Sequence, residues 1–247
     1  FSEENDEVIV QTPIYPPLFK CVNANNRKVV VNELKKDENG YYTMDLEDLE
    51  SKITPKTKIL ALCSPHNPVG RVWSKDELEK LANICIKHNI IIVSDEIHSD
   101  ITFKKFTPLA SISKEIANQT ITLNSAGKTF NIAGLNSAYA ISKNQKILDK
   151  FKKIAQKREI QSINFFGYVA TKAAYDNGAL FVEKLKKYLL SNIEFTKNYL
   201  KKNNSKIDFK PPEATYLLWL DFSRYNLSHN EIKNILLTKS KIALNDG

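Results

Sequence analysis

An amide, a carboxylate and an amine follow three apolar, strand-sized segments of this sequence. The segments are Lys58–Leu62, Ile90–Val93 and Thr120–Leu123. The polar residues that come after them include Asn67, Asp95 and Lys128, respectively. Ligands of open parallel sheets bind outside the carboxyl ends of the strands. We therefore expect these three side chains to meet at one edge of a sheet.

These residue types match the needs of an aldehyde cofactor. Desolvation and nearby cations lower the pKa of a lysine, which would make Lys128 a usable nucleophile toward an aldehyde. A carboxylate such as Asp95 keeps a pyridine nitrogen protonated and so turns that ring into an electron sink. An Asn67 N–H can hydrogen-bond a phenolate oxygen on the same ring. The set fits pyridoxal 5'-phosphate (PLP) better than a metal ion, because Asp95–His98 has no second ligand cluster at a recognised spacing.

Strand and helix signals alternate through the first part of the chain. Strand-like runs are Glu7–Thr12, Lys28–Leu34, Lys58–Leu62, Ile90–Val93, Thr120–Leu123 and Ser137–Ile141, with helical patterns at Asp45–Ile53, Ser74–His88 and Ser111–Asn118. Ser74 followed by Glu77 predicts a capping box. The β-branched run Ile90–Val93 predicts a strand covered on both faces. Strands separated by helices of this length imply right-handed crossovers and a mostly parallel sheet.

The pattern changes to long helices from about Asn144. These are expected at Gln145–Lys157, Phe165–Tyr175 and Leu180–Lys201. The remaining runs are short and resemble the start of a smaller α+β unit: Ile207–Phe209, Tyr216–Asp221, Ser228–Leu237 and Ile242–Leu244. We therefore divide the chain into an α/β domain of residues 1–180 and the start of a small domain at 181–247.

Composition and charge narrow the class of protein. The chain has 247 residues, 42% hydrophobic and 26% charged, with 7 Gly, 9 Pro and 3 Cys, which excludes collagen-like, low-complexity and disulfide-scaffold proteins. The net charge of +8 comes from lysines spread among apolar residues, as in Lys150–Lys157. Nucleic-acid binding favours clustered basic residues with interleaved aromatics. We expect no nucleic-acid partner and, since no apolar run is long enough to cross a bilayer, no membrane partner.

The cysteines and the first residues bear on the cellular compartment. Cys21, Cys63 and Cys85 form no CxxC pair, and their odd number argues against a disulfide framework. Phe1–Val8 carries acidic residues and neither Lys nor Arg, unlike a secretory signal. A reducing, cytoplasmic setting is the expectation.

Longer motifs around these residues resemble a known family. They are Cys63–Trp73 (CSPHNPVGRVW), Ser94–His98 (SDEIH), Lys128–Leu135 (KTFNIAGL), Gln11–Phe19 (QTPIYPPLF) and Pro212–Phe222 (PEATYLLWLDF). Together they resemble fold-type I PLP enzymes of the aminotransferase class I/II superfamily, and most closely the MalY/PatB-type cystathionine β-lyases. The resemblance implies a three-layer αβα large domain, similar to aspartate aminotransferase, with a mostly parallel sheet.

The resemblance also implies roles for individual residues. Lys128 would bind PLP covalently through its amine, and Asp95 would pair with the pyridinium nitrogen; these two are the expected catalytic residues. Asn67 would hydrogen-bond the ring's O3′ and Tyr15 would stack on the ring face. Ser125 would contact the phosphate.

Two of the assigned residues have simpler alternative interpretations. His98 stands where many aminotransferases have a tyrosine directed at O3′, and histidine there is typical of the β-lyase-like group; the alternative is an ordinary loop histidine. Tyr15 could instead be a turn aromatic beside prolines.

The chain also departs from the family pattern. Gly127 stands where many relatives have Ser, and Asn136 where aspartate aminotransferases have a phosphate-binding Arg. Relatives have a phosphate-binding loop before the part that matches Phe1, and an Arg that clamps the substrate carboxylate beyond the part that matches Gly247. We therefore expect the chain to be truncated at both ends.

The resemblance favours β-elimination on a sulfur amino acid, which gives pyruvate, ammonia and a thiol. A class I/II aminotransferase would use the same Lys128, Asp95 and Asn67, so these residues do not separate the two reactions. A non-catalytic, PLP-binding regulatory protein is a third interpretation. The family implies a small amino-acid substrate and a homodimer.

Overall fold

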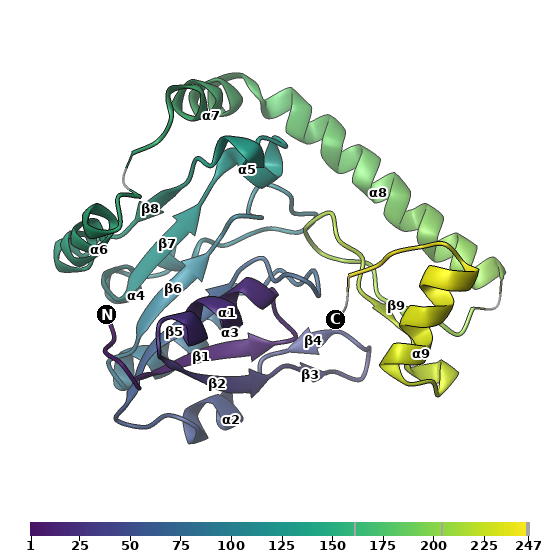
Figure 1. The fold of residues 1–247 in the computed structure, drawn as a ribbon, viewed down its shortest axis with the longest axis horizontal. Coiled ribbons are helices and arrows are strands. Elements are labelled where there is room, and N and C mark those ends of the chain that lie inside the picture. The colour runs from purple at the N-terminus through teal and green to yellow at the C-terminus, as the bar shows by residue number, and fades with distance from the viewer. Residues whose placement is uncertain (161, 204, 246–247) are drawn as a thin grey trace.

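A sheet of six strands forms the centre of the part of the chain that the computed structural model describes, residues 1–160, 162–203 and 205–245 (Figure 1). In spatial order the strands are β2 (Lys28–Glu33), β1 (Glu7–Thr12), β5 (Thr57–Cys63), β6 (Ile91–Asp95), β7 (Thr120–Asn124) and β8 (Tyr139–Ile141). The first five are parallel, and β8 pairs antiparallel with β7 at the edge. The predicted mostly parallel sheet is confirmed.

Helices cover both faces of this sheet. Side chains of α2 (Leu46–Ser51), α3 (Lys75–Lys87) and α4 (Lys114–Gln119) pack against Leu60 and Ile92 on one face. On the other face, α1 (Pro16–Ala24) packs against a separate cluster of alternate strand residues: Val8, Val10, Ala61 and Cys63. The alternation follows from the two-residue period of a strand. The αβα layering is therefore confirmed.

Helix α1 (Pro16–Ala24) is not predicted from the sequence pattern. Pro16 and Pro17 read as turn residues, yet they occupy the first turn of the helix, where a backbone N–H has no intrahelical partner. Tyr15 stands at the N-cap position, and none of its side-chain atoms caps the helix.

The predicted capping box of α3 is present. The Glu77 N–H donates to Ser74 Oγ at 3.2 Å, and the Ser74 N–H donates to Glu77 Oε2 at 2.8 Å. The prediction for β6 is right for one face only. Ile90 and Ile92 are fully buried, whereas Ile91 and Val93 are half-buried.

The second part of the chain is helical as expected, with α6 (Gln145–Lys157), α7 (Phe165–Asn177) and α8 (Ala179–Lys202). The short strands β9 (Asp208–Phe209) and β10 (Leu220–Asp221) pair antiparallel. Helix α9 (His229–Asn234) continues as a π-helical turn, and the described residues contain no strand at 242–244. The division at residue 180 stays a prediction. Among the described residues, no helix combines the length and apolarity needed to span a membrane.

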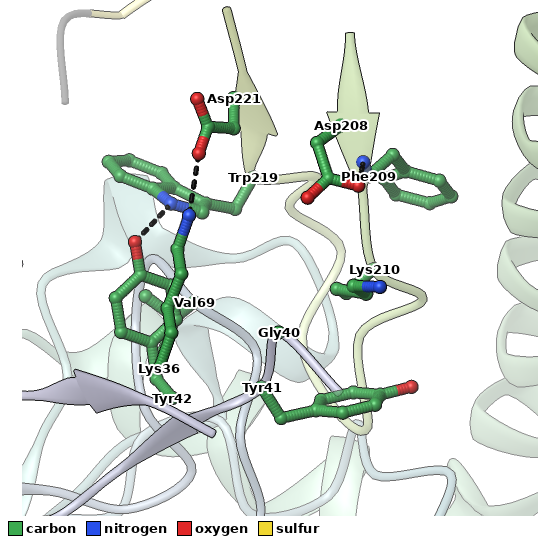
Figure 2. Close-up of a pocket in the computed structure, with 10 residues that line it drawn as sticks. All are labelled: Lys36, Gly40, Tyr41, Tyr42, Val69, Asp208, Phe209, Lys210, Trp219 and Asp221. Atoms are coloured by element: carbon green, nitrogen blue, oxygen red, sulfur yellow. Dashed lines mark hydrogen bonds and ion pairs between the residues drawn. The ribbon is translucent and has the colours of Figure 1, made fainter. Parts of the chain in front are cut away.

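A hairpin of β3 (Lys35–Lys36) and β4 (Tyr42–Thr43) joins the two parts (Figure 2). Lys36 Nζ lies 2.5 Å from Asp221 Oδ2, and Trp219 Nε1 donates to Tyr42 Oη at 3.1 Å. The ion pair with Lys36 lowers the pKa of Asp221 to about 2. A small pocket lies between the hairpin and the second part of the chain (Figure 2). None of the residues that line this pocket belongs to the predicted site.

Candidate active site

The strand order brings the predicted site residues to one edge of the sheet. Strands β1, β5, β6 and β7 are consecutive neighbours and parallel, so their carboxyl ends lie together. Tyr15, Asn67, Asp95 and Lys128 all lie at or just beyond these four ends. The predicted convergence at one edge is therefore confirmed, while the individual roles stay predictions.

Asp95 is the last residue of β6 and pairs in register with Cys63 of β5. Burial raises the pKa of its carboxyl, an effect opposed by the Ile97 N–H, which donates to Oδ1 at 3.2 Å, and by the positive charge of Lys128. The Lys128 amine is therefore close enough for its charge to act on Asp95. The second carboxylate oxygen has no hydrogen-bond donor among the described residues.

Lys128 lies on α5 (Ala126–Thr129), a single helical turn that directly follows β7. The neighbouring Thr129 is buried, and its hydroxyl donates to Asp100 Oδ2 at 3.0 Å, which anchors the turn. Lys128 itself is half-buried and forms no ion pair within the described part of the chain. The Lys128 amine is therefore available to a ligand at this edge of the sheet.

Ser125 is the N-cap of α5, and its hydroxyl is already engaged. Oγ accepts from the Gly127 N–H at 2.9 Å and donates to the Ser137 carbonyl oxygen at 2.5 Å. A hydroxyl has a single proton to donate, so a bond from Ser125 to a phosphate requires this hydroxyl to rotate away from Ser137. A Cβ at Gly127 would lie 3.0 Å from Ser125 Oγ and 3.2 Å from Ala133 Cα, which leaves little space for the Ser of many relatives.

Asn67 lies in a compact loop that Cys63 helps to hold. Its backbone N–H donates to Cys63 Sγ at 3.3 Å, and its side-chain amide has no partner among the described residues. Burial raises the pKa of the Cys63 thiol to about 12, so this sulfur stays protonated and serves in packing. The free amide of Asn67 is available to a ligand at the strand ends.

His98 is the most buried residue of the predicted site, with 2% of its surface exposed. Burial, with a smaller effect from the Lys128 charge, lowers its pKa to about 4. The imidazole is therefore neutral at physiological pH. Nδ1 has no hydrogen-bond partner among the described residues, although the atom is buried. This unpartnered nitrogen favours a functional role over that of an ordinary loop histidine.

Tyr15 is placed at the correct edge but is 43% exposed. Its backbone carbonyl oxygen accepts from the Leu18 N–H at 3.1 Å, in the first turn of α1. The ring is accessible for stacking, and that role stays a prediction.

The sequence interpretation missed one residue beside this site. The ring of Tyr216 meets that of His98 edge-on, with centroids 5.6 Å apart. Tyr216 belongs to the motif Pro212–Phe222, which contributed only to the family resemblance. The motif was recognised, but its assignment to the start of a smaller α+β unit gave no reason to place the ring at a site more than 80 residues away in the sequence.

The buried His66 supplies a prediction about pH. Its Nε2 lies 3.3 Å from the Gln11 carbonyl oxygen, and burial lowers its pKa from 6.5 to about 4. A lowered folded-state pKa gives stability that is present above pH 6.5 and is lost as the pH falls toward 4. We expect the wild type to lose about 2 kcal/mol more than His66→Gln between pH 8 and pH 5, measured by urea unfolding. The half-exposed His88, as His88→Gln, is the control; equal pH slopes for wild type and His66→Gln would contradict the prediction.

Comparison with known proteins gives the family. The pattern described as aminotransferase class I and II matches residues 1–247. Cystathionine beta-lyase PatB of Bacillus subtilis (strain 168) is 38% identical over 100% of this chain and 64% of its own length. The chain therefore spans less than two thirds of that relative. It belongs to the aminotransferase class I and II family.

Two solved structures share the fold. A PLP-bound putative aminotransferase from Clostridium difficile 630 has a TM-score of 0.96 and 48% identity, over 99% of this chain and 63% of that one. Cystalysin from Treponema denticola, whose structure contains PLP, has a TM-score of 0.97 and 34% identity, over 100% of this chain and 63% of that one. The expected fold class is confirmed.

Proposed function

We propose that this chain is part of a PLP-dependent carbon–sulfur lyase that converts a sulfur amino acid into pyruvate, ammonia and a thiol. The observation that carries the proposal is the meeting of Asp95 and Lys128 at the carboxyl ends of β6 and β7, where the lysine charge acts on the carboxyl group. The similarity to the cystathionine beta-lyase PatB supports the lyase reaction.

The unsatisfied groups of the site fit PLP. They comprise a half-buried amine without an ion pair, a free amide, a carboxylate oxygen without a donor and the unpartnered nitrogen of His98. The His98 nitrogen is buried, so it is costly to leave it unsatisfied unless a ligand supplies its partner, and the other three groups are partly exposed and therefore accessible to a ligand. The residues that would hold PLP are Tyr15, Asn67, Asp95, His98, Ser125 and Lys128.

Bound PLP withdraws electrons from the substrate Cα. Asp95 would keep a proton on the ring nitrogen of PLP, and it lies at the end of a central strand, which holds the carboxylate in place. The Lys128 amine would remove the proton from the substrate Cα as general base. The electron pair left at Cα would expel the thiolate from Cβ, and water would then hydrolyse the remaining unsaturated amino acid to pyruvate and ammonia. The neutral His98 offers a hydrogen bond without adding a positive charge beside Lys128.

The reaction is tested by supplying the full-length protein with PLP and cystathionine and no keto acid. We expect pyruvate to form steadily, because elimination needs no amino-group acceptor. The rival function is transamination, which the name of the Clostridium difficile relative favours. Turnover that starts only after a keto acid is added would contradict the lyase proposal and support the transaminase.

We further propose that the full-length protein is a cytoplasmic homodimer. The free cysteines Cys21, Cys63 and Cys85 are compatible with a reducing compartment. Large apolar side chains on α7 are exposed, among them Phe165 at 74% and Phe166 at 73%. Exposed aromatic residues of this kind are typical of surfaces that another protein segment covers.

A further inference from the structure

The segment after β9 turns back toward the carboxyl edge of the sheet and binds two of its loops. The Glu213 and Ala214 N–H groups donate to the Gly70 carbonyl oxygen at 2.8 and 3.0 Å. On the other side, the Phe103 N–H donates to the Glu213 carbonyl oxygen, and the Thr215 N–H to that of Ile101, both at 2.8 Å. The segment is thus held between the loop after β5 and the loop after β6.

The side-chain carboxylate of Glu213 also binds both of these loops. It is 8% exposed; Oε2 accepts from the Val72 N–H at 3.0 Å and lies 3.5 Å from Arg71 Nε. Oε1 pairs with Lys104 of the other loop. A buried carboxylate with this many donors is strongly tied to its position, because losing the charge leaves its partners unsatisfied.

Arg71 is itself fixed, so it gives Glu213 a rigid anchor. Its Nη2 lies 2.9 Å from Glu77 Oε1 on α3, and its guanidinium lies 5.0 Å from the centre of the Trp73 ring. The approach of the segment is also close at Gly70, which has a φ of +72°. A Cβ there would lie 2.4 Å from Pro212 Cβ. Only glycine allows this contact.

These contacts position Tyr216 beside the candidate active site. Thr215, directly before it, is fully buried and has a φ of 72°, an unfavourable conformation for a β-branched residue. Such strain persists only where the surrounding contacts enforce it, and it is frequent at ligand sites. The Tyr216 ring then meets His98 while 42% of the residue stays exposed. The ring therefore contacts His98 and also keeps exposed surface that a ligand can reach.

We propose that Tyr216 is a substrate-contacting residue, whose exposed surface meets the amino-acid side chain, and that Glu213 is the positioning residue that holds it there. The inference rests on the proposed function. Nothing in it requires Glu213 to touch PLP or substrate, so its effect should pass entirely through Tyr216.

The test compares Tyr216→Ala, Glu213→Gln and the double variant in the full-length protein with cystathionine. We expect each single change to raise KM roughly tenfold with kcat altered less than about threefold, as for a lost aromatic contact in binding. The double variant should match Tyr216→Ala alone, because removing the ring leaves Glu213 nothing to position. Glu183→Gln, which removes an exposed carboxylate that pairs with Lys187 on α8 and does not contact the segment, is the matched control and should leave KM unchanged.

Two further readouts do not depend on turnover. Hydrogen–deuterium exchange of residues 212–217 should accelerate in Glu213→Gln, while PLP affinity, followed by absorbance, stays the same in all variants. If Glu213→Gln fails to fold, Lys104→Met removes the exposed partner of the same carboxylate and should act in the same direction more weakly. Additive effects on KM, unchanged exchange, or a loss of PLP affinity would overturn the inference. A wild type that forms no pyruvate defeats the proposed function instead, and leaves the exchange result to be read separately.

Discussion

Lys128→Ala is expected to lower turnover at least about 10³-fold, because in the proposed mechanism one amine both holds the cofactor covalently and moves the Cα proton. The effect should be larger than for any other residue of the site, since no second amine of the described chain shares the turn α5. Reduction with borohydride followed by peptide mass spectrometry should find PLP attached at Lys128 in the wild type, and no attachment in the variant.

Lys146→Ala is a matched control, because Lys146 is an exposed lysine on α6. It should retain wild-type turnover and PLP labelling. Full activity of Lys128→Ala, or borohydride labelling of another lysine in the wild type, would remove Lys128 from its proposed role and with it the lyase mechanism.

Asp95→Asn is expected to lower kcat roughly 10²-fold or more and to weaken PLP binding. The amide has the same size as the carboxylate and can still accept the Ile97 N–H, so packing is retained. The variant loses the negative charge that, in the proposed mechanism, keeps the ring nitrogen protonated. Steady-state pyruvate formation and equilibrium titration with PLP measure the two effects separately.

The control for this change is Asp76→Asn. Asp76 pairs with Lys80 on the exposed face of α3, where a surface ion pair contributes little. We expect its kcat and PLP affinity to equal those of the wild type. An Asp95→Asn protein that turns over at the wild-type rate would show that the carboxyl does not support a cofactor ring.

Local sequence signals predicted most of the elements of the large sheet. Apolar periodicity and a capping box depend on neighbours within a few residues. These signals predict strands β1, β2, β5, β6 and β7 and helix α3. Helix α1 was not predicted, because prolines are as typical of a turn as of the first turn of a helix. The short strands β9 and β10 are set by pairing across a long connection, so a local window cannot delimit them.

The site divides in the same way. The sequence placed Asn67, Asp95 and Lys128 at strand ends, and parallel strands bring such ends together. It could not supply the strand order that puts β1 beside β5, nor the burial that keeps His98 neutral. Desolvation depends on every segment packed around a side chain, and no single segment reports it.

The amino-acid sequence by itself determined the strands that precede Asn67, Asp95 and Lys128 and the chemical types of these groups. The tertiary structure alone decided that Glu213 reaches across 141 positions to the backbone of Val72, and that Tyr216 thereby lies against His98. The physical reason is the sequence separation over which the interactions act. Periodicity and capping act over a few residues, whereas a buried carboxylate finds its donors only after the whole chain has folded around it.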